Sequence, residues 1–600
     1  MSKLYELSRV IMPDGAFLPL YEELFTRRKE KTCMFSGVLT NVNIYEFDTW
    51  MNAFSAKIYH TYCDLGKLYL SLDIEGSYKV VVFGSELNNV FNRIDTPLLE
   101  QNYSGKSVIE IPNSATYDGI AFKIYEDKAN PIKIHGGAWC TDKEPLRDNK
   151  LAVITCTFKR EEYVTRNIAL FENFLKENPS LKHKMKYILS DNGKTLPASL
   201  NSDNVNIYPN INAGGAGGFT RGIIEALHDK ETFDRVLLMD DDVEIFPESF
   251  YRVLLMSNYL KEEYKDSFIN GAMVDLYSKD MYFENLGIES EFWVAGYHHP
   301  QTLFDYTNVL KVLNIPRHVQ EGSLGMKSAG WWYCSFTVDT IKEKGLPLPF
   351  FIRCDDMEWS WRNNDKTFIW LNGVNVWHAP FLWRVSKVVE RYFTLRNIFY
   401  TRLLHTSGLK NKFRKWFWEV INNMISMYDY VSAELYIMAL EDILKGPEVL
   451  KENPEEKFKS LNSVQKQVQY LECYDKDELD EVRIKPRHKV AGWRKFLYRI
   501  TTRGLHCPDC FYEKEGTAIE WYPPVPDFIM IKEVKVYNIL TGKYEVRKLD
   551  KKKSLYYRQK GKALLDEIYN RYEELEKNAK AAYNEFTTEE FWRNYLGLDK

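Results

Sequence analysis

The sequence has no long apolar run and no marked excess of charge of either sign. A transmembrane helix needs about 18 to 20 consecutive apolar residues, and none occurs in the 600-residue chain. The first ten residues, MSKLYELSRV, lack the apolar core of a signal peptide. A formal net charge of −4 carries no general signature of nucleic-acid binding. We therefore expect a cytoplasmic protein without a nucleic-acid partner.

Cysteine is scarce and scattered along the chain. Nine cysteines are an odd number, which favours a reducing compartment over a framework of disulfides. Cys507 and Cys510 form the one close pair, and no second pair at zinc-finger spacing accompanies them. Two interpretations of this pair stay open, namely plain thiols or part of a structural zinc site.

The two ends of the sequence differ in pattern. A chain of 600 residues is too long for one hydrophobic core. Short β-rich runs such as YLSLDI and YKVVVF predict an antiparallel β-sandwich over residues 1–145, with carbohydrate binding as one option for it. The sequence is charged and helical in pattern from about residue 385. A C-terminal helical domain is therefore predicted over residues 401–600, with contacts to a membrane or to other copies in a homo-oligomer.

Residues 146–400 have the pattern of a doubly wound, Rossmann-like α/β domain. The run 151–158 is almost entirely apolar, as in a strand buried on both faces. Helical spacing then relates Val164, Ile168, Phe171 and Leu175. Further strands are expected at 186–190, 205–208 and 235–239, and a helix at 221–228. This alternation predicts a mostly parallel sheet, which binds ligands beyond the carboxyl ends of its strands.

Three adjacent carboxylates, Asp240, Asp241 and Asp242, directly follow the strand predicted at 235–239. A divalent cation would offset their mutual repulsion. A site with few protein carboxylates, completed by substrate phosphates, is typical of Mg²⁺ or Mn²⁺. His378, in the segment WHAPF, could add a neutral imidazole as the last ligand. The alternatives are a solvated acidic turn and a histidine satisfied within the core.

A glycine-rich segment, NAGGAGGFTRG, occupies residues 212–222 ahead of the predicted helix. Its backbone N–H groups could approach an anionic or ribose-bearing ligand closely. It lacks the Gly-Lys-Ser/Thr of a Walker A loop and the spacing of a dinucleotide-binding loop. Within an α/β sheet it is a candidate donor site, and a flexible turn is the alternative.

A second acidic pair, Asp355 and Asp356, follows the apolar segment LPFFI. A carboxylate there could accept the proton of an acceptor hydroxyl while its oxygen attacks an anomeric carbon. An ordinary helix N-terminus, where aspartate is favourable, is the alternative. Trp331 and Trp332 stand beside small residues, so they are either core residues or a platform for an acceptor sugar.

Taken in order, these features resemble the polymerising galactofuranosyltransferases of glycosyltransferase family 2, which build mycobacterial galactan. The matching segments are NAGGAGGFTRG, MDDD, the neighbourhood of Glu284 and Trp293, WWYCSF, CDDMEW and WHAPF. The resemblance covers roughly residues 30–400. It implies a GT-A catalytic domain that uses Mn²⁺ or Mg²⁺ and transfers galactofuranose from UDP-galactofuranose, with inversion, to a hydroxyl of a lipid-linked glycan. The setting would be the synthesis of a bacterial cell-surface polysaccharide.

The resemblance also implies a role for each matching residue. Asp356 would be the general base, with Asp355 beside it on the sugars. The metal ligands would be Asp240, Asp242 and His378. The UDP half of the donor would contact Thr157, Arg160, Asn192, Asn212, Asp240 and Asp241. The acceptor and donor sugars would contact Glu284, Trp293, Trp331 and Trp332.

A lipid-linked acceptor raises the question of a membrane surface. In the segment 489–503 one predicted helical stripe carries Val490, Trp493, Leu497 and Ile500. Basic residues surround it, namely Lys489, Arg494, Lys495, Arg499 and Arg503. This pattern is typical of a helix lying in an anionic interface, and the segment 410–418 is similar. We expect peripheral attachment to the inner face of the cell membrane, with a helix docked on its own protein as the alternative.

Two other functions stay open. A related enzyme could use another nucleotide sugar, carrying rhamnose, glucose or galactose, in the synthesis of capsule or O-antigen. A non-catalytic carbohydrate-binding scaffold is the second alternative, and the presence of both acidic clusters argues against it.

Overall fold

The computed structural model describes residues 3–13, 21–35, 38–291, 293–296, 300–314, 325–379, 386–472, 490–519, 523–538 and 541–599. The chain forms two compact units. The first comprises Met1–Asn212, Gly218–Leu346 and Asp356–Pro380, and the second comprises Ala213–Gly217, Pro347–Asp355 and Phe381–Lys600. None of the helices in the described ranges combines the length and the apolarity that a membrane span requires.

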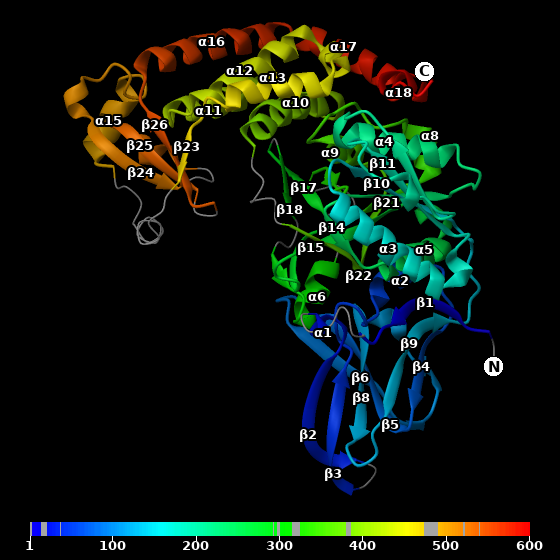
Figure 1. Cartoon of the computed structure of the whole chain (residues 1–600). Coiled ribbons are helices and arrows are strands. Elements are labelled where there is room, and N and C mark those ends of the chain that lie inside the picture. Colours follow the sequence, from blue (N-terminus) through cyan, green and yellow to red (C-terminus); the bar gives the residue numbers. More distant parts are fainter. Residues whose placement is uncertain are drawn as a thin grey trace. The chain divides into compact units, whose positions relative to one another are not determined.

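Two antiparallel sheets form the N-terminal part of the first unit (Figure 1). One has the order β1-β9-β4-β7 and the other β2-β3-β8-β5-β6. The strands are β1(Tyr5–Val10), β2(Arg27–Phe35), β3(Val38–Glu46), β4(Leu68–Glu75), β5(Ser77–Leu87), β6(Arg93–Ser104), β7(Ser107–Ile111), β8(Gly119–Asp127) and β9(Lys133–Thr141). The rings of Phe122 in β8 and Trp139 in β9 meet edge to face at 5.8 Å, so the apolar faces of the two sheets pack together. The predicted β-sandwich is confirmed, with two short helices, α1(Glu22–Phe25) and α2(Ala56–Tyr62), that were not predicted.

The rest of the first unit is built on a larger sheet. Its parallel half has the order β12-β11-β10-β13. These strands are β10(Leu151–Thr157), β11(Met185–Asp191), β12(Val205–Pro209) and β13(Arg235–Met239). Along the chain this order is third, second, first and fourth, so it reverses between β10 and β13. A reversal of this kind is where doubly wound sheets bind their ligands.

Helix α3(Glu161–Glu177) shows why the sequence folds in this way. The predicted stripe is buried, namely Val164, Ile168, Phe171 and Leu175. Asn167 lies on the same face, and its Nδ2 donates a hydrogen bond to the Val243 carbonyl at 3.0 Å. All five residues of β13 are buried, as expected of a strand covered on both faces.

Beyond β13 the sheet continues with strands of mixed direction. They are β21(Cys334–Thr337), β15(Phe268–Asp275), β16(Met281–Glu284) and β19(Gln301–Thr302), and β22(Phe368–His378) pairs with both β15 and β14(Val243–Ile245). Strand β21 is antiparallel to both β13 and β15, and β22 is parallel to β15. Strands β10, β11, β12, β13, β15 and β22 therefore present their carboxyl ends at one edge of the sheet.

The glycine-rich segment is not a loop. Helix α4(Gly214–Leu227) begins within it, seven residues before the predicted start. A Cβ on Gly218 would lie 2.0 Å from Sγ of Cys156, and one on Gly222 would lie 2.3 Å from Cγ2 of Ile154. Glycine is required at these positions because α4 packs directly on β10.

Seven α-helices make up most of the described second unit. They are α10(Thr394–His405), α11(Lys410–Ser426), α12(Tyr430–Lys445), α13(Pro454–Gln465), α16(Lys551–Asn570), α17(Tyr572–Phe586) and α18(Glu589–Leu596). Helix α16 packs along α11 and α12 (Figure 1). The predicted C-terminal helical region is confirmed. The unit also contains a sheet that was not predicted, of order β23-β26-β25-β24, formed by β23(Tyr470–Glu472), β24(Glu513–Ile519), β25(Ile531–Asn538) and β26(Lys543–Lys548).

The two basic, aromatic segments of this unit differ in their surroundings. In α11, Phe413 and Phe417 are buried, and ion pairs join Lys410 to Glu573 and Arg414 to Asp566. This helix is docked on its own chain, so the membrane interpretation of segment 410–418 is wrong.

The second segment contains another helix of this unit, α15(Gly492–Ile500). The predicted stripe is divided. Val490 is buried in a small cluster with Cys507 and Met530, and Leu497 packs against it. Trp493 and Ile500 are exposed instead. Lys489 lies outside the described residues.

Candidate active site

Asp240, Asp242 and His378 meet at the carboxyl edge of the large sheet. The two aspartates lie between β13 and β14, and His378 is the last residue of β22. The pairing of β14 with β22 sets Val243 opposite His378, which brings the imidazole to the acidic turn. Its Nε2 lies 3.2 Å from Oδ1 of Asp242 and 3.7 Å from Oδ2 of Asp240. One ligand atom from each of the three residues falls within 4.8 Å of the others.

The donor set fits a hard divalent cation. Nδ1 of His378 lies 2.6 Å from the carbonyl oxygen of Ala379. A proton on Nδ1 completes that hydrogen bond and leaves the lone pair of Nε2 facing the carboxylates, as a metal ligand requires. Two carboxylates and one imidazole, without a thiolate, suit Mn²⁺ or Mg²⁺. Asp242 and His378 are buried, whereas Asp240 is partly open to solvent.

Asp241 points away from this triad toward the end of β10. Its Oδ2 accepts a hydrogen bond from the Phe158 N–H at 3.2 Å. Burial raises the pKa of Asp241, and contacts with Thr157, the Phe158 N–H and Arg160 oppose that rise. Thr157 ends β10, and Arg160 precedes α3. Asp241, Thr157 and Arg160, three of the predicted donor-binding residues, therefore lie together where the strand order reverses.

Asn192 follows β11 and belongs to the same edge. Its backbone N–H donates to the Thr157 carbonyl at 2.9 Å, and its Nδ2 lies 3.3 Å from Sγ of Cys156. Its Oδ1 accepts a hydrogen bond of 2.9 Å from Nδ2 of the buried Asn210. Asn212 is half-buried two residues further on. The sequence argument missed Asn210, because its importance rests on a contact across the sheet edge.

Phe158 was also missed. It follows Thr157 directly, its ring is 44% exposed, and the ammonium of Lys159 lies over that ring at 5.2 Å from the centroid. Lys159 has a positive φ of 56°. An exposed ring beside the donor residues offers a stacking surface for a planar base. The signal in the sequence was a phenylalanine placed just past the end of a buried strand.

The second acidic group lies on other elements. Asp356 is in the first turn of α9(Asp355–Arg362), where its Oδ1 accepts a hydrogen bond from the Met357 N–H at 2.7 Å. Glu284 ends β16, and burial, followed by the charge of Asp356, raises its pKa to about 7. Cys334 begins β21, and burial together with Asp356 raises its pKa. Cys334 pairs with Leu238, near the carboxyl end of β13. The charge of Asp356 therefore raises the pKa of a residue close to that end of β13.

The three tryptophans have different surroundings. Trp332 is buried, and its Nε1 donates to the Gly271 carbonyl at 3.1 Å, which is a core arrangement. Trp331 is also buried, but its indole N–H has no hydrogen-bond acceptor among the described residues. Trp293 begins β18(Trp293–Gly296) and is 38% exposed. At the other end of β18, a Cβ on Gly296 would lie 2.3 Å from Oε2 of Glu284.

Glu358, two residues after Asp356, does not join the site. Its carboxylate is fully buried and accepts two hydrogen bonds from Arg362, at 3.1 Å from Nε and 2.6 Å from Nη2. Asp355 begins α9, and its Oδ2 would lie 2.8 Å from a Cβ on Gly215.

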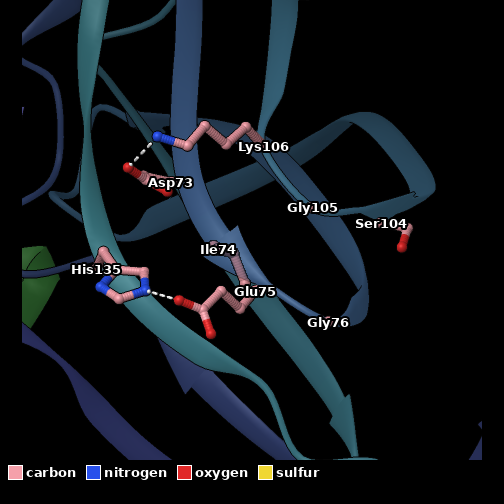
Figure 2. Close-up of a pocket in the computed structure, with 8 residues that line it drawn as sticks. All are labelled: Asp73, Ile74, Glu75, Gly76, Ser104, Gly105, Lys106 and His135. Atoms are coloured by element: carbon pink, nitrogen blue, oxygen red, sulfur yellow. Dashed lines mark hydrogen bonds and ion pairs between the residues drawn. The ribbon is translucent and has the colours of Figure 1, made fainter.

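The β-sandwich has a pocket of its own, of about 600 Å³ (Figure 2). It is lined by Asp73, Ile74, Glu75, Gly76, Ser104, Gly105, Lys106 and His135. Two contacts of 2.7 Å, between Lys106 and Asp73 and between His135 and Glu75, occupy its charged groups (Figure 2). The lining contains no phenylalanine, tyrosine or tryptophan ring on which a sugar could stack. Carbohydrate binding by this domain stays a prediction.

Comparison with known proteins assigns the chain to a reaction class. No protein-family model matches the chain. Over 482 residues the chain is 26% identical to galactofuranosyltransferase GlfT2 of Mycolicibacterium smegmatis. The match covers 74% of this chain and 72% of that protein. Galactofuranosyltransferase GlfT2 of Mycobacterium tuberculosis is 24% identical over the same length. The chain is a glycosyltransferase. The resemblance to galactofuranosyltransferases that the motifs predicted is confirmed.

The α/β architecture that the resemblance implies is confirmed as well: a doubly wound sheet, with an N-terminal β-sandwich and a C-terminal helical region. Among solved structures, a mannosyltransferase from Pyrobaculum calidifontis matches 44% of this chain and covers 66% of its own, at 11% identity and a TM-score of 0.28. Similarity at that level supports no conclusion about this glycosyltransferase.

Proposed function

We propose that this glycosyltransferase moves galactofuranose from UDP-galactofuranose to a hydroxyl group of a lipid-linked glycan, with inversion at the anomeric carbon and with Mn²⁺ or Mg²⁺ as cofactor. The observation that carries the proposal is the division of acidic residues into two sets. Asp240 and Asp242 converge with His378, whereas Asp356 influences Glu284 from another element. The choice of sugar rests on the names of the two mycobacterial relatives.

The first set would hold the cation, through one carboxylate oxygen each from Asp240 and Asp242 and Nε2 of His378. A bound divalent cation neutralises the charge that develops on the leaving diphosphate. Asp241, Thr157 and Arg160 would contact the nucleotide, together with Asn192 and Asn212. The positive charge of Arg160 would attract the anionic diphosphate. The carboxyl end of β10 lies where the strand order reverses, which is where doubly wound sheets bind nucleotides.

The second set would manage the proton. The acceptor hydroxyl gives its proton to the carboxylate of Asp356 while its oxygen forms the new bond to the anomeric carbon. The bond from that carbon to the diphosphate breaks, and its electron pair leaves on the diphosphate oxygen. In an inverting displacement the base and the leaving group act on opposite faces, so two separate sets of carboxylates are needed. Asp355 would contact the sugars beside the base.

Three further residues would orient the sugars. Glu284, with its pKa raised to about 7, is partly protonated at neutral pH, and in its protonated form it can donate a hydrogen bond to a sugar oxygen. The indole N–H of Trp331 is a buried donor that a sugar hydroxyl could satisfy. Trp293 is exposed enough for its ring to lie against a sugar face. Trp332 would support this group from the core.

A transfer assay tests the proposal. The enzyme is incubated with a divalent cation, a short lipid-tailed galactoside and one donor at a time, and the products are measured by mass spectrometry. UDP-galactofuranose is expected to extend the acceptor. The other donors are UDP-glucose, UDP-galactose and dTDP-rhamnose, and extension with one of these alone would assign the enzyme to the other-sugar alternative. No transfer from any donor would favour the non-catalytic scaffold.

A lipid-linked acceptor also calls for a membrane contact, which we place on α15. Trp493, Phe496 and Ile500 lie on one helical face and are 52%, 62% and 61% exposed. Lys495 and Arg499 are exposed on the same helix. Exposed apolar residues flanked by basic side chains fit the surface of an anionic bilayer. We call these five residues the α15 face and propose that it attaches the enzyme to the inner face of the cell membrane. The homo-oligomer and the division at residues 145 and 400 stay predictions.

A further inference from the structure

The turn that carries the second acidic pair has an unusual backbone. Arg353 and Cys354 both have positive φ, at 69° and 65°. Neither residue is a glycine, and the left-handed region is strained for other L-amino acids. Two consecutive residues in this region persist only where the surroundings enforce them. Asp355 and Asp356 follow at once, so the conformation of this turn sets the direction in which α9 begins.

One side chain from α10 is bound to this turn by its carboxamide. Nδ2 of Asn397 donates to the carbonyls of Ile352, at 3.0 Å, and of Arg353, at 2.9 Å. Its Oδ1 accepts a hydrogen bond of 3.1 Å from Nε of Arg396, which fixes the orientation of the amide. Asn397 is completely buried. Both N–H groups of the amide are therefore directed at two successive carbonyls of the strained turn.

An ion pair with Glu390, just before α10, holds the side chain of Arg353 in the turn. Nη2 of Arg353 lies 2.5 Å from Oε1 of Glu390. Glu390 belongs to a π-helical turn, Val389–Phe393, that leads directly into α10. Wide turns of this type are often retained where a side chain has a functional placement.

The start of α4 supports the turn through its backbone. The Gly215 N–H donates to the Phe351 carbonyl at 3.0 Å. A Cβ on Gly214 would lie 1.7 Å from that carbonyl oxygen. The glycines thus allow a backbone contact that a side chain would prevent. Between α10 and α4, the carbonyls of three successive residues, 351 to 353, are all bound.

We infer that Asn397 is a positioning residue for the transfer reaction, because its amide holds the left-handed turn that presents Asp356. The inference rests on the proposed role of Asp356 as the base. Asn397 acts through the backbone and touches neither sugar nor nucleotide. A displacement of about 1 Å at the reacting group can lower a rate about 10²-fold, so the effect of losing the amide should appear in the chemical step.

The first experiment measures kcat, KM and UDP affinity for Asn397→Ala. We expect kcat to fall about 10²-fold, with UDP affinity and the KM for the donor unchanged. Asn52→Ala is the matched control. Asn52 is also buried, and its Nδ2 donates to two carbonyls, those of Ile11 and Phe25. It lies outside the candidate site, and its variant should retain the kcat of the wild type.

A rescue experiment separates positioning from a general loss of packing. Glycine adopts positive φ without strain, so Cys354→Gly should restore most of the kcat that Asn397→Ala loses. Cys354→Ala is its control, because alanine also removes the thiol but keeps the strain. Rescue by glycine and not by alanine supports the inference. An Asn397→Ala enzyme with the kcat of the wild type, or a loss that glycine fails to restore, overturns it.

If Asn397→Ala does not fold, a second variant tests the same inference. Glu390→Gln weakens the Arg353 contact at a partly exposed position, and Cys354→Gly should again restore kcat. Absence of both the loss and the rescue overturns the inference. Asp356→Asn distinguishes this result from failure of the proposed function. If that variant still transfers, the base assignment fails. If it is inactive while Asn397→Ala is fully active, the positioning role alone fails.

Discussion

The imidazole of His378 and the carboxylate of Asp242 meet at 3.2 Å, although Asp242 lies in the turn between β13 and β14 and His378 ends β22. Two other contacts position these side chains. Pairing of β14 with β22 places Val243 opposite His378, and the Ala379 carbonyl fixes Nδ1 of the ring. The ligand nitrogen is therefore aimed at the carboxylates by the fold itself, which lowers the cost of ordering when a cation binds.

This arrangement predicts that His378→Ala weakens the binding of Mn²⁺. Removal of a ligand should cost at least as much as removal of a supporting group, for which losses of about 10- to 100-fold are usual. Titration calorimetry of Mn²⁺ in the presence of UDP measures the effect. His183→Ala, which alters an exposed histidine, serves as the control and should bind Mn²⁺ like the wild type. Equal affinity of His378→Ala and wild type would remove His378 from the metal site.

Glu284 predicts a pH dependence of stability. Burial, then Asp356, raises its pKa from 4.5 to about 7. The folded protein therefore keeps a proton that the unfolded chain loses at lower pH, so its free energy of unfolding falls as pH rises from about 4.5 to about 7. Glu284→Gln does not titrate. Relative to wild type it should gain stability across this window, by at most about 3 kcal/mol.

Urea unfolding of both proteins at several pH values between 4.5 and 8 measures this difference. The control is Glu162→Gln, at an exposed position of α3, whose difference from wild type should stay constant. A constant difference for Glu284→Gln as well would show that Glu284 is ionised in the folded protein at neutral pH.

The α15 face predicts binding to anionic vesicles. Lys495→Glu with Arg499→Glu should weaken binding at least tenfold, because each basic residue near such a surface contributes about 1 kcal/mol. Trp493→Ser with Phe496→Ser should weaken it by loss of apolar burial. Flotation with phosphatidylcholine vesicles, with and without phosphatidylglycerol, measures both. Lys552→Glu with Lys562→Glu makes the same charge change on α16 and should bind like the wild type. Binding that none of these changes affects would place the contact elsewhere.

Much of the α/β unit could be predicted, because its signals are local. The buried stripe of α3 and the apolar strand before Asp240 follow from periodicity and burial alone. The early start of α4 could not be predicted in this way. A run of glycines favours a loop by propensity, and only the close approach of Cys156 and Ile154 explains why a helix is stable there.

The remaining errors have the same origin in long-range packing. Strands β24 and β26 are half-exposed and rich in charged residues, so their alternation is weak in the sequence. The expected stripe of α15 is divided because two separate segments, one containing Cys507 and the other Met530, cover Val490. The role of Asn397 was not predicted, since it depends on two backbone carbonyls 44 and 45 residues away.

The central claim is that two sets of carboxylates divide the work, one on the diphosphate and the other on the proton. The most direct test measures UDP–Mn²⁺ affinity and galactofuranose transfer in the same two variants. Asp356→Asn should bind UDP with Mn²⁺ like the wild type but lose about 10²- to 10⁴-fold in transfer rate, whereas Asp242→Asn should lose the Mn²⁺-dependent affinity itself. Transfer by Asp356→Asn at the rate of the wild type, or an equal loss of nucleotide affinity in both variants, would contradict the account.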